Sequence, residues 1–159
     1  MNASPPADLV HLAARLGLAV VLGGMLGLNR EMRQKPAGLR THALVTLGAA
    51  LVTIIGTLMT GPPGDSGTLG RLVQGLLAGI GFLGGGVILH RDDTKGVHGL
   101  TTAASVWLVA AVGIAVGAGL WAAGAIAIGL ALAVLAIGGP IDERLRRPSS
   151  IQNPPTRNP

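Results

Sequence analysis

The sequence predicts an all-α fold, a polytopic membrane protein built as a bundle of five transmembrane helices. Its 159 residues are 49% hydrophobic and only 12% charged, whereas about one quarter of the residues in an average soluble domain are charged. Long stretches without any charge match the ~20 residues that a helix needs to cross a bilayer. Basic segments separate alternate stretches, a pattern typical of proteins with several spans.

The first two predicted spans lie on either side of a basic segment. Residues 1–8 contain no Lys or Arg, and the first span covers about residues 9–28. Residues 29–40 are polar and basic, and the second span follows at about residues 41–59. The sequence GPPGD after it marks a turn, because Gly and Pro break regular structure.

The third predicted span, about residues 72–89, is rich in glycine. Small residues four positions apart let the backbone of another helix come close. We therefore expect this span to be the central packing helix of the bundle. The glycines that we expect to pack against other helices, here and in the first span, are Gly23, Gly27, Gly75, Gly79, Gly81, Gly84, Gly85 and Gly86.

Residues 79–84, GIGFLG, also match the G-x-G-x-x-G pattern of dinucleotide-binding sites. A functional copy of that pattern needs a strand before it and an acidic residue about 20 positions further on. Here the pattern lies inside an apolar helix, and Asp92 and Asp93 follow too early. We interpret it as a packing motif.

Residues 100–139 contain no charged residue and would form a helix of roughly 60 Å, about twice the hydrocarbon thickness. This segment must fold back on itself, giving a fourth span at about 100–116 and a fifth at about 120–138. The glycines that mark the expected turn are Gly113, Gly117 and Gly119.

Basic residues predict the orientation of the spans. Ten of the twelve lie in residues 29–40, 91–99 and 140–159, whereas the N-terminus and the two remaining connections contain none. This alternation predicts an N-terminus outside the cell and a cytoplasmic C-terminus. Pro, Ser and Asn in residues 140–159 predict a disordered cytoplasmic tail that starts at Pro140.

This topology brings polar residues from four segments to the cytoplasmic side, where they would form a polar pocket. The alternative is that they are ordinary interfacial residues, with Glu31 paired to Arg30 or Arg40 and with hydroxyls bonded to their own helices. The expected pocket residues are Asn29, Arg30, Glu31, Arg40, Thr41, His42, Thr101, Thr102 and Ser105, next to Gly84, Gly85 and Gly86.

A smaller polar cluster is expected on the outer side, from His11 and Arg15 of the first span and Arg71 and Gln74 of the third. Two arginines there would bind a lipid phosphate or a carboxylate of a partner. The alternative is that these long side chains only extend to the membrane interface.

Several kinds of chemistry are not expected. The chain has no cysteine, and none of its seven acidic residues lies inside a span, so we expect no metal site, no cofactor and no disulfide. Paired carboxylates are absent from the spans, and the common hydrolase and nucleotide motifs are absent from the sequence, which disfavours an enzyme. The net charge of +5 comes from the basic loops and tail and therefore predicts no nucleic-acid partner.

Four motifs together resemble the MgtC/SapB family of bacterial inner-membrane proteins over roughly residues 10–138. They are GxxxGLNRE at residues 23–31, KPAGLRTH at 35–42, GIGFLGGG at 79–86, and GLTTAA at 99–104 followed by Trp107. The resemblance implies a five-helix membrane domain. It also implies a link to growth in low magnesium and to survival inside host cells, and partners among other membrane proteins, including the ATP synthase.

The sequence also departs from the family pattern. Thr68 stands where the family usually has an acidic residue, His98 stands where it has an arginine, and the soluble C-terminal domain of many members is not in this sequence. The matching residues that the resemblance marks as functional are Arg30, Glu31, Arg40, Thr41, Arg71, Gln74, Thr101 and Thr102.

Two functions are compatible with these observations. The first is a non-enzymatic regulator that is embedded in membrane lipid and docks through glycine-rich helix faces on another integral membrane complex or on a second copy of itself. The alternative is a small transporter or channel subunit for Mg²⁺ or another cation. A transporter needs polar groups along its whole path, whereas the spans between the two polar regions are mostly Ala, Val, Leu, Ile and Gly. This favours the regulator.

Overall fold

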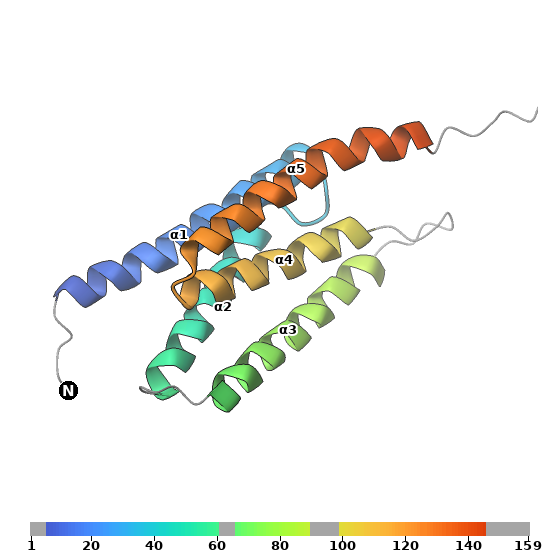
Figure 1. Cartoon of the computed structure of the whole chain (residues 1–159). Coiled ribbons are helices and arrows are strands. Elements are labelled where there is room, and N and C mark those ends of the chain that lie inside the picture. The colour runs from blue at the N-terminus through green and yellow to red at the C-terminus, as the bar shows by residue number, and fades with distance from the viewer. Residues whose placement is uncertain (1–5, 61–65, 90–98, 146–159) are drawn as a thin grey trace, which may run out of the picture.

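The computed structural model describes residues 6–60, 66–89 and 99–145, and in these segments it contains five helices and no strand. All five helices are long and apolar enough to cross a membrane. Consecutive helices run in opposite directions (Figure 1). Their bounds are α1, Pro6–Met32; α2, Leu39–Thr60; α3, Ser66–Leu89; α4, Leu100–Gly117; and α5, Trp121–Leu145.

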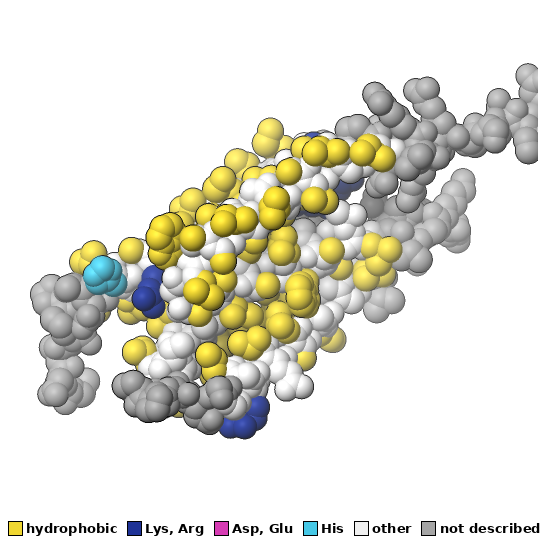
Figure 2. All heavy atoms as spheres, viewed as in Figure 1, with side chains coloured by type: hydrophobic (Ala, Val, Ile, Leu, Met, Phe, Trp, Pro, Cys, Tyr) yellow, Lys and Arg dark blue, Asp and Glu magenta, His cyan; other side chains and the backbone are white. Residues whose placement is uncertain are grey.

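Apolar side chains cover most of the visible face of the bundle, and Lys and Arg side chains lie towards its two ends (Figure 2). A surface of this kind suits lipid along the middle of each helix and water or headgroups at the ends. We call the end where α1 finishes and α2 and α4 begin the basic end, because it carries Arg30, Arg33, Lys35 and Arg40.

The helix at the centre of the bundle is α4, which contacts each of the other four helices. In Figure 1, α1 and α5 lie side by side on one face, and α3 lies at the opposite edge against α2 and α4. Half of the α4 span is buried, compared with 6% of the α3 span. The sequence-based expectation that residues 72–89 form the central helix is therefore wrong.

Glycines set the spacing between α1, α2 and α4. They are not the glycines of residues 72–89, which the sequence analysis emphasised most. A Cβ at Gly27 of α1 would lie 2.8 Å from the Gly38 carbonyl oxygen, and one at Gly23 would collide with Thr46. From the other side, a Cβ at Gly117 of α4 would lie 2.6 Å from the Ala50 carbonyl oxygen. The backbone of α2 is thus approached closely by α1 and by α4.

Two of the three glycines expected in the turn before the fifth span have a different place. Gly113 and Gly117 lie inside α4 and pack against α2, four residues apart. The turn itself is a Schellman motif around Gly119, whose φ is +87°. The Leu120 N–H donates to the Ala115 carbonyl at 2.8 Å, and the Gly119 N–H donates to the Val116 carbonyl at 3.0 Å.

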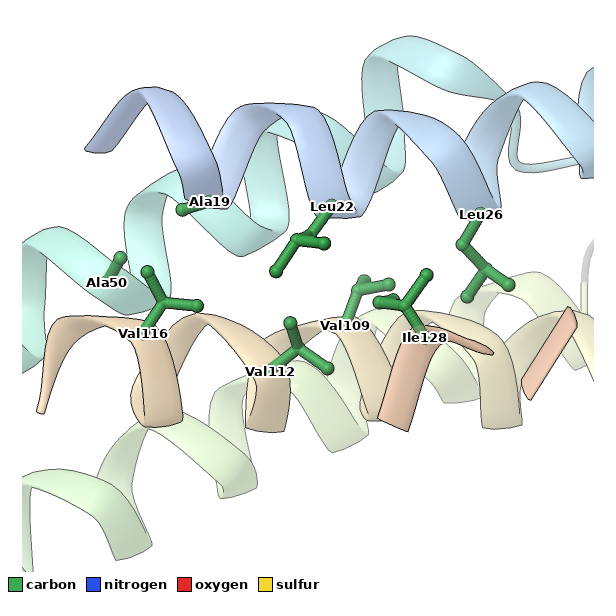
Figure 3. Close-up of a cluster of buried hydrophobic side chains, with 8 residues drawn as sticks. All are labelled: Ala19, Leu22, Leu26, Ala50, Val109, Val112, Val116 and Ile128. Atoms are coloured by element: carbon green, nitrogen blue, oxygen red, sulfur yellow. The ribbon is translucent and has the colours of Figure 1, made fainter. Parts of the chain in front are cut away.

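An apolar core fills the space between α1, α4 and α5 (Figure 3). Leu22 and Leu26 point from α1 towards Val109 and Val112 of α4 and Ile128 of α5. In a water-soluble protein, fully burying a side chain of this size stabilises the fold by about 1.5–3 kcal/mol. In a membrane the same residues act through close packing instead.

The ends of two helices differ from the expectation. The first helix continues through Asn29, Arg30 and Glu31 to Met32, so these residues are helical. At the other end of the chain, α5 passes through Pro140 and ends at Leu145, although the tail was expected to start at Pro140. A proline removes one N–H from the helix ladder, and membrane helices tolerate this loss. The expected disorder of residues 146–159 lies outside the described residues.

Gly117→Ala tests the close approach of α4 to α2. Its methyl group would be forced against the Ala50 carbonyl, so we expect a loss of about 1–3 kcal/mol in the free energy of unfolding. The matched control is Gly129→Ala on α5, where the new Cβ meets nothing within 4 Å. Unfolding in detergent micelles followed by circular dichroism measures both, and equal stability of the two variants would contradict the packing.

Candidate functional site

A cluster of buried polar side chains joins three helices at the basic end, and we call it the polar junction. Its members are Arg30 of α1, His42 of α2, and Thr102 and Ser105 of α4. The guanidinium of Arg30 reaches from the last turns of α1 to the first turn of α4. There its Nη2 donates a hydrogen bond of 2.9 Å to Thr102 Oγ1.

His42 connects the junction to both neighbouring chain segments. Its Nδ1 lies 2.9 Å from the Gly38 carbonyl oxygen, and its Nε2 lies 3.0 Å from Ser105 Oγ. The Ser105 hydroxyl in turn lies 2.8 Å from the Thr102 carbonyl oxygen, which is an acceptor for it. One continuous set of hydrogen bonds therefore ties the start of α2 to the start of α4.

The four side chains of the junction are almost sealed from solvent. Arg30 is 3% exposed, His42 0%, Thr102 2% and Ser105 5%. Two further buried atoms on α1, Arg30 Nε and Asn29 Oδ1, have no hydrogen-bond partner in the described part of the chain. An unpaired buried polar atom costs about 1–3 kcal/mol. The expected pocket is thus a closed junction, and it retains two unsatisfied groups.

The junction contains a serine and a histidine at hydrogen-bond distance, which is the arrangement of a nucleophile and its base. Their burial leaves no path for a substrate to Ser105 Oγ in this conformation. In the described segments, no three His, Cys, Asp or Glu side chains come together as ligands for a metal ion. The geometry is that of a structural connection between helices.

Glu31 caps the N-terminus of α2. Its Oε2 accepts a hydrogen bond of 2.8 Å from the Leu39 backbone N–H. A carboxylate at this position satisfies an unpaired N–H group and interacts favourably with the helix dipole. Between the two helices the chain turns in a second Schellman motif, in which Gln34 adopts a φ of 53°.

The other expected pocket residues do not enter the junction. Arg40, Thr41 and Thr101 are exposed, and Asn29 is half-buried with its side-chain oxygen directed inside. Of the three glycines at the end of α3, Gly84 lies against Ala103 of α4, whereas a Cβ at Gly85 or Gly86 would meet nothing within 4 Å. Of the nine expected pocket residues, the junction contains Arg30, His42, Thr102 and Ser105.

The expected outer cluster is divided in two. The helices α1 and α3, which carry its members, do not contact each other in the described segments. Arg15 of α1 extends to the α4–α5 turn, with its Nη2 3.6 Å from the Cβ position of Gly119, near the negative end of the α4 dipole. Arg71 of α3 instead donates a hydrogen bond of 2.9 Å to Thr68 on its own helix.

Sequence reasoning missed Gly38, Thr46 and Thr53. The Gly38 carbonyl fixes the His42 ring, and the two threonine hydroxyls donate to carbonyls of their own helix at 2.7 and 2.8 Å. A signal for the threonines was present, because residues seven apart lie on one helix face. Nothing in the sequence singles out a backbone carbonyl.

Known proteins are similar in sequence to the helices that form this junction. The model of the MgtC family matches residues 16–144. The chain belongs to the MgtC family. Protein SrpB of Synechococcus elongatus is 43% identical over 121 residues, which are 71% of this chain and 66% of that protein. Protein MgtC of Brucella abortus (strain 2308) is 41% identical over 109 residues, 69% of this chain and 43% of that protein.

Protein MgtC of Salmonella typhimurium (strain 14028s) is 44% identical over 99 residues, which are 62% of this chain. The chain spans less than half the length of these MgtC relatives, 43% of the Brucella protein and 40% of the Salmonella protein. No solved structure matches the chain. All four junction residues lie inside the part that the MgtC family model matches.

Thr102→Val tests the contribution of the junction to stability of this MgtC-family protein. The substitution keeps the shape of Thr102 and leaves the buried Arg30 Nη2 without its acceptor, so we expect a loss of about 1–3 kcal/mol in unfolding free energy. Thr101→Val is the matched control at the exposed neighbouring position, with an expected change within about 0.5 kcal/mol. Detergent unfolding measures both, and a tolerated Thr102→Val would argue against a structural junction.

Proposed function

We propose that this protein is a non-enzymatic membrane regulator that docks on another integral membrane complex through the outward face of α3. The observation that supports this proposal is the face itself. A Cβ at Gly75, Gly79 or Gly86 would meet nothing within 4 Å, and Phe82 among them is 84% exposed. At 100° per residue these four positions share one side of the helix.

Glycine on this face has a cost that the fold itself does not offset. Each glycine in a helix interior is about 0.8–1.0 kcal/mol less favourable than alanine. The glycines of α1 and α4 that pack against α2 gain close backbone contact in return, but those on the outward face of α3 gain none from the described residues. A transmembrane helix of a partner would supply that contact, with Phe82 as a protruding anchor.

Family membership supplies the physiological context of the proposal, which is adaptation to magnesium limitation. Direct transport of Mg²⁺ receives less support from the structure. The core between α1, α4 and α5 is apolar, and the two buried threonines of α2 donate to carbonyls of their own helix. A cation would find few oxygen ligands along this interior.

Crosslinking in native membranes tests the docking surface. The tagged protein is expressed in a bacterial host at low and at high magnesium, crosslinked and purified, and its partners are identified by mass spectrometry. Gly79→Leu should reduce recovery of a membrane complex at least about tenfold, because a leucine blocks close helix approach. Gly129→Leu on α5, where the site is also open, is the matched control and should retain the partner.

Three outcomes of this experiment are distinguishable. A partner complex that is lost only with Gly79→Leu supports regulation by docking. Crosslinks between copies of the chain that are lost with the same variant would identify the α3 face as a homo-oligomer interface. Recovery that is equal in both leucine variants would contradict a role for α3.

The proposed orientation has the N-terminus outside and the basic end in the cytoplasm, because basic loops remain on the cytoplasmic side. Since the chain contains no cysteine, one introduced thiol reports one position. In intact cells a membrane-impermeant maleimide should label Leu120→Cys and leave Lys35→Cys unlabelled until the cells are lysed. The opposite labelling pattern would reverse the topology.

A further inference from the structure

His42 lies in surroundings that can satisfy two protonation states. Its Nδ1 faces the carbonyl oxygen of Gly38 at 2.9 Å. A carbonyl only accepts hydrogen bonds, so Nδ1 carries its hydrogen whether the ring is neutral or charged. The state of the ring is therefore decided at Nε2, which accepts a hydrogen bond when the ring is neutral and donates one when it is charged.

The hydroxyl of Ser105 can serve either state. Its oxygen lies 3.0 Å from His42 Nε2 and 2.8 Å from the Thr102 carbonyl oxygen. When His42 is neutral, the Ser105 O–H donates to Nε2. When His42 is charged, Nε2–H donates to Ser105 Oγ, and the hydroxyl hydrogen turns to the Thr102 carbonyl. The hydrogen bonds of both states can form with the same positions of the nitrogen and oxygen atoms.

The charges around His42 give its neutral and charged states different free energies. From α1 it faces Arg30, whose charge acts on it electrostatically, and from α4 it contacts the uncharged hydroxyl of Ser105. On its own side, Arg40 is exposed and the Glu31 carboxylate is engaged by the Leu39 N–H. Glu31 is the one acidic residue whose side-chain burial is described, and it is exposed. A charged His42 thus adds a second buried cation with no carboxylate beside it.

We propose that the polar junction is a proton-operated latch, in which protonation of His42 separates the end of α1 from the start of α4. Repulsion between His42 and Arg30 acts across the contact that the Arg30–Thr102 hydrogen bond holds closed. The proposal concerns the fold alone and does not depend on docking to a partner.

An independent observation favours an open state. Arg30 Nε and Asn29 Oδ1 are buried without a partner in the closed junction. Both atoms gain water when α1 moves away, so opening relieves a cost that the closed state carries. The closed state is held by the Thr102 contact and by the packing of Gly27 on α2. One added charge on His42 is then sufficient to shift the equilibrium between the closed and open states of the junction.

Spin-label distances in lipid nanodiscs test the latch in the full chain. One label is placed at Met32→Cys, at the end of α1, and the other at Thr101→Cys, at the start of α4, and both positions are exposed. We expect the ratio of long to short distances to rise about tenfold between about pH 8 and about pH 5. The control pair, Val10→Cys with Leu120→Cys, reports the opposite end and should not change.

Two variants remove the charges separately. His42→Asn keeps a donor for the Gly38 carbonyl without a titrating group, and Arg30→Gln removes the charge of Arg30 with a polar but shorter side chain. Each should abolish the change in distance with pH, so the test survives if one of them fails to fold. A change with pH that persists in both variants would overturn the proposal.

Nitrogen NMR of histidine-labelled protein gives a second readout that does not depend on the spin labels. The His42 signal, assigned by its loss in His42→Asn, should show an unprotonated Nε2 at high pH and a protonated one at low pH. A His42 that never titrates over this range overturns the latch. A His42 that titrates while the α1–α4 distance stays constant also overturns it, because protonation and opening would then be separate.

Discussion

The structure depends on how closely the backbone of α2 is approached from two sides. Gly27 of α1 lies against Gly38 and His42, and Gly117 of α4 lies against Ala50 and Thr53. Any side chain at these glycines would push the helices apart by the size of a methyl group or more. The hydrogen bonds of the polar junction join α1 to α4 and α2 to α4 at 2.9–3.0 Å, so a shift between these helices would break them.

The junction shows how polar groups specify a helix arrangement in an apolar medium. Van der Waals packing between Ala, Val and Leu side chains tolerates sliding, whereas the Arg30–Thr102 and His42–Ser105 contacts each exist in one register. The cost is a guanidinium that is buried with one nitrogen unpaired. Stability and specificity are therefore in tension at this end of the bundle.

The number and approximate position of the helices followed from the sequence, because charge-free stretches of membrane length and alternating basic loops leave few alternatives. The approximate location of the polar residues followed from the same topology. The choice of central helix did not follow. Glycine spacing shows that a helix can be approached closely, but it does not show by which helix. Gly75 and Gly79 of α3 remain open, whereas Gly113 and Gly117 of α4 pack against α2. Nor could the spacing show that Glu31 binds the Leu39 N–H of the next helix, since that contact depends on a tight turn at Gln34.

The central position of α4 has a consequence for how the protein is made. Synthesis delivers α1, α2 and α3 before α4, and yet α4 is the helix that contacts all the others. While the chain is being made, α3 is next to α2 in sequence but must not occupy the surface of α2 that later receives Gly113 and Gly117. The sparse packing of α3 suits this order, because a loosely held helix at the edge leaves the inner surface vacant for its successor.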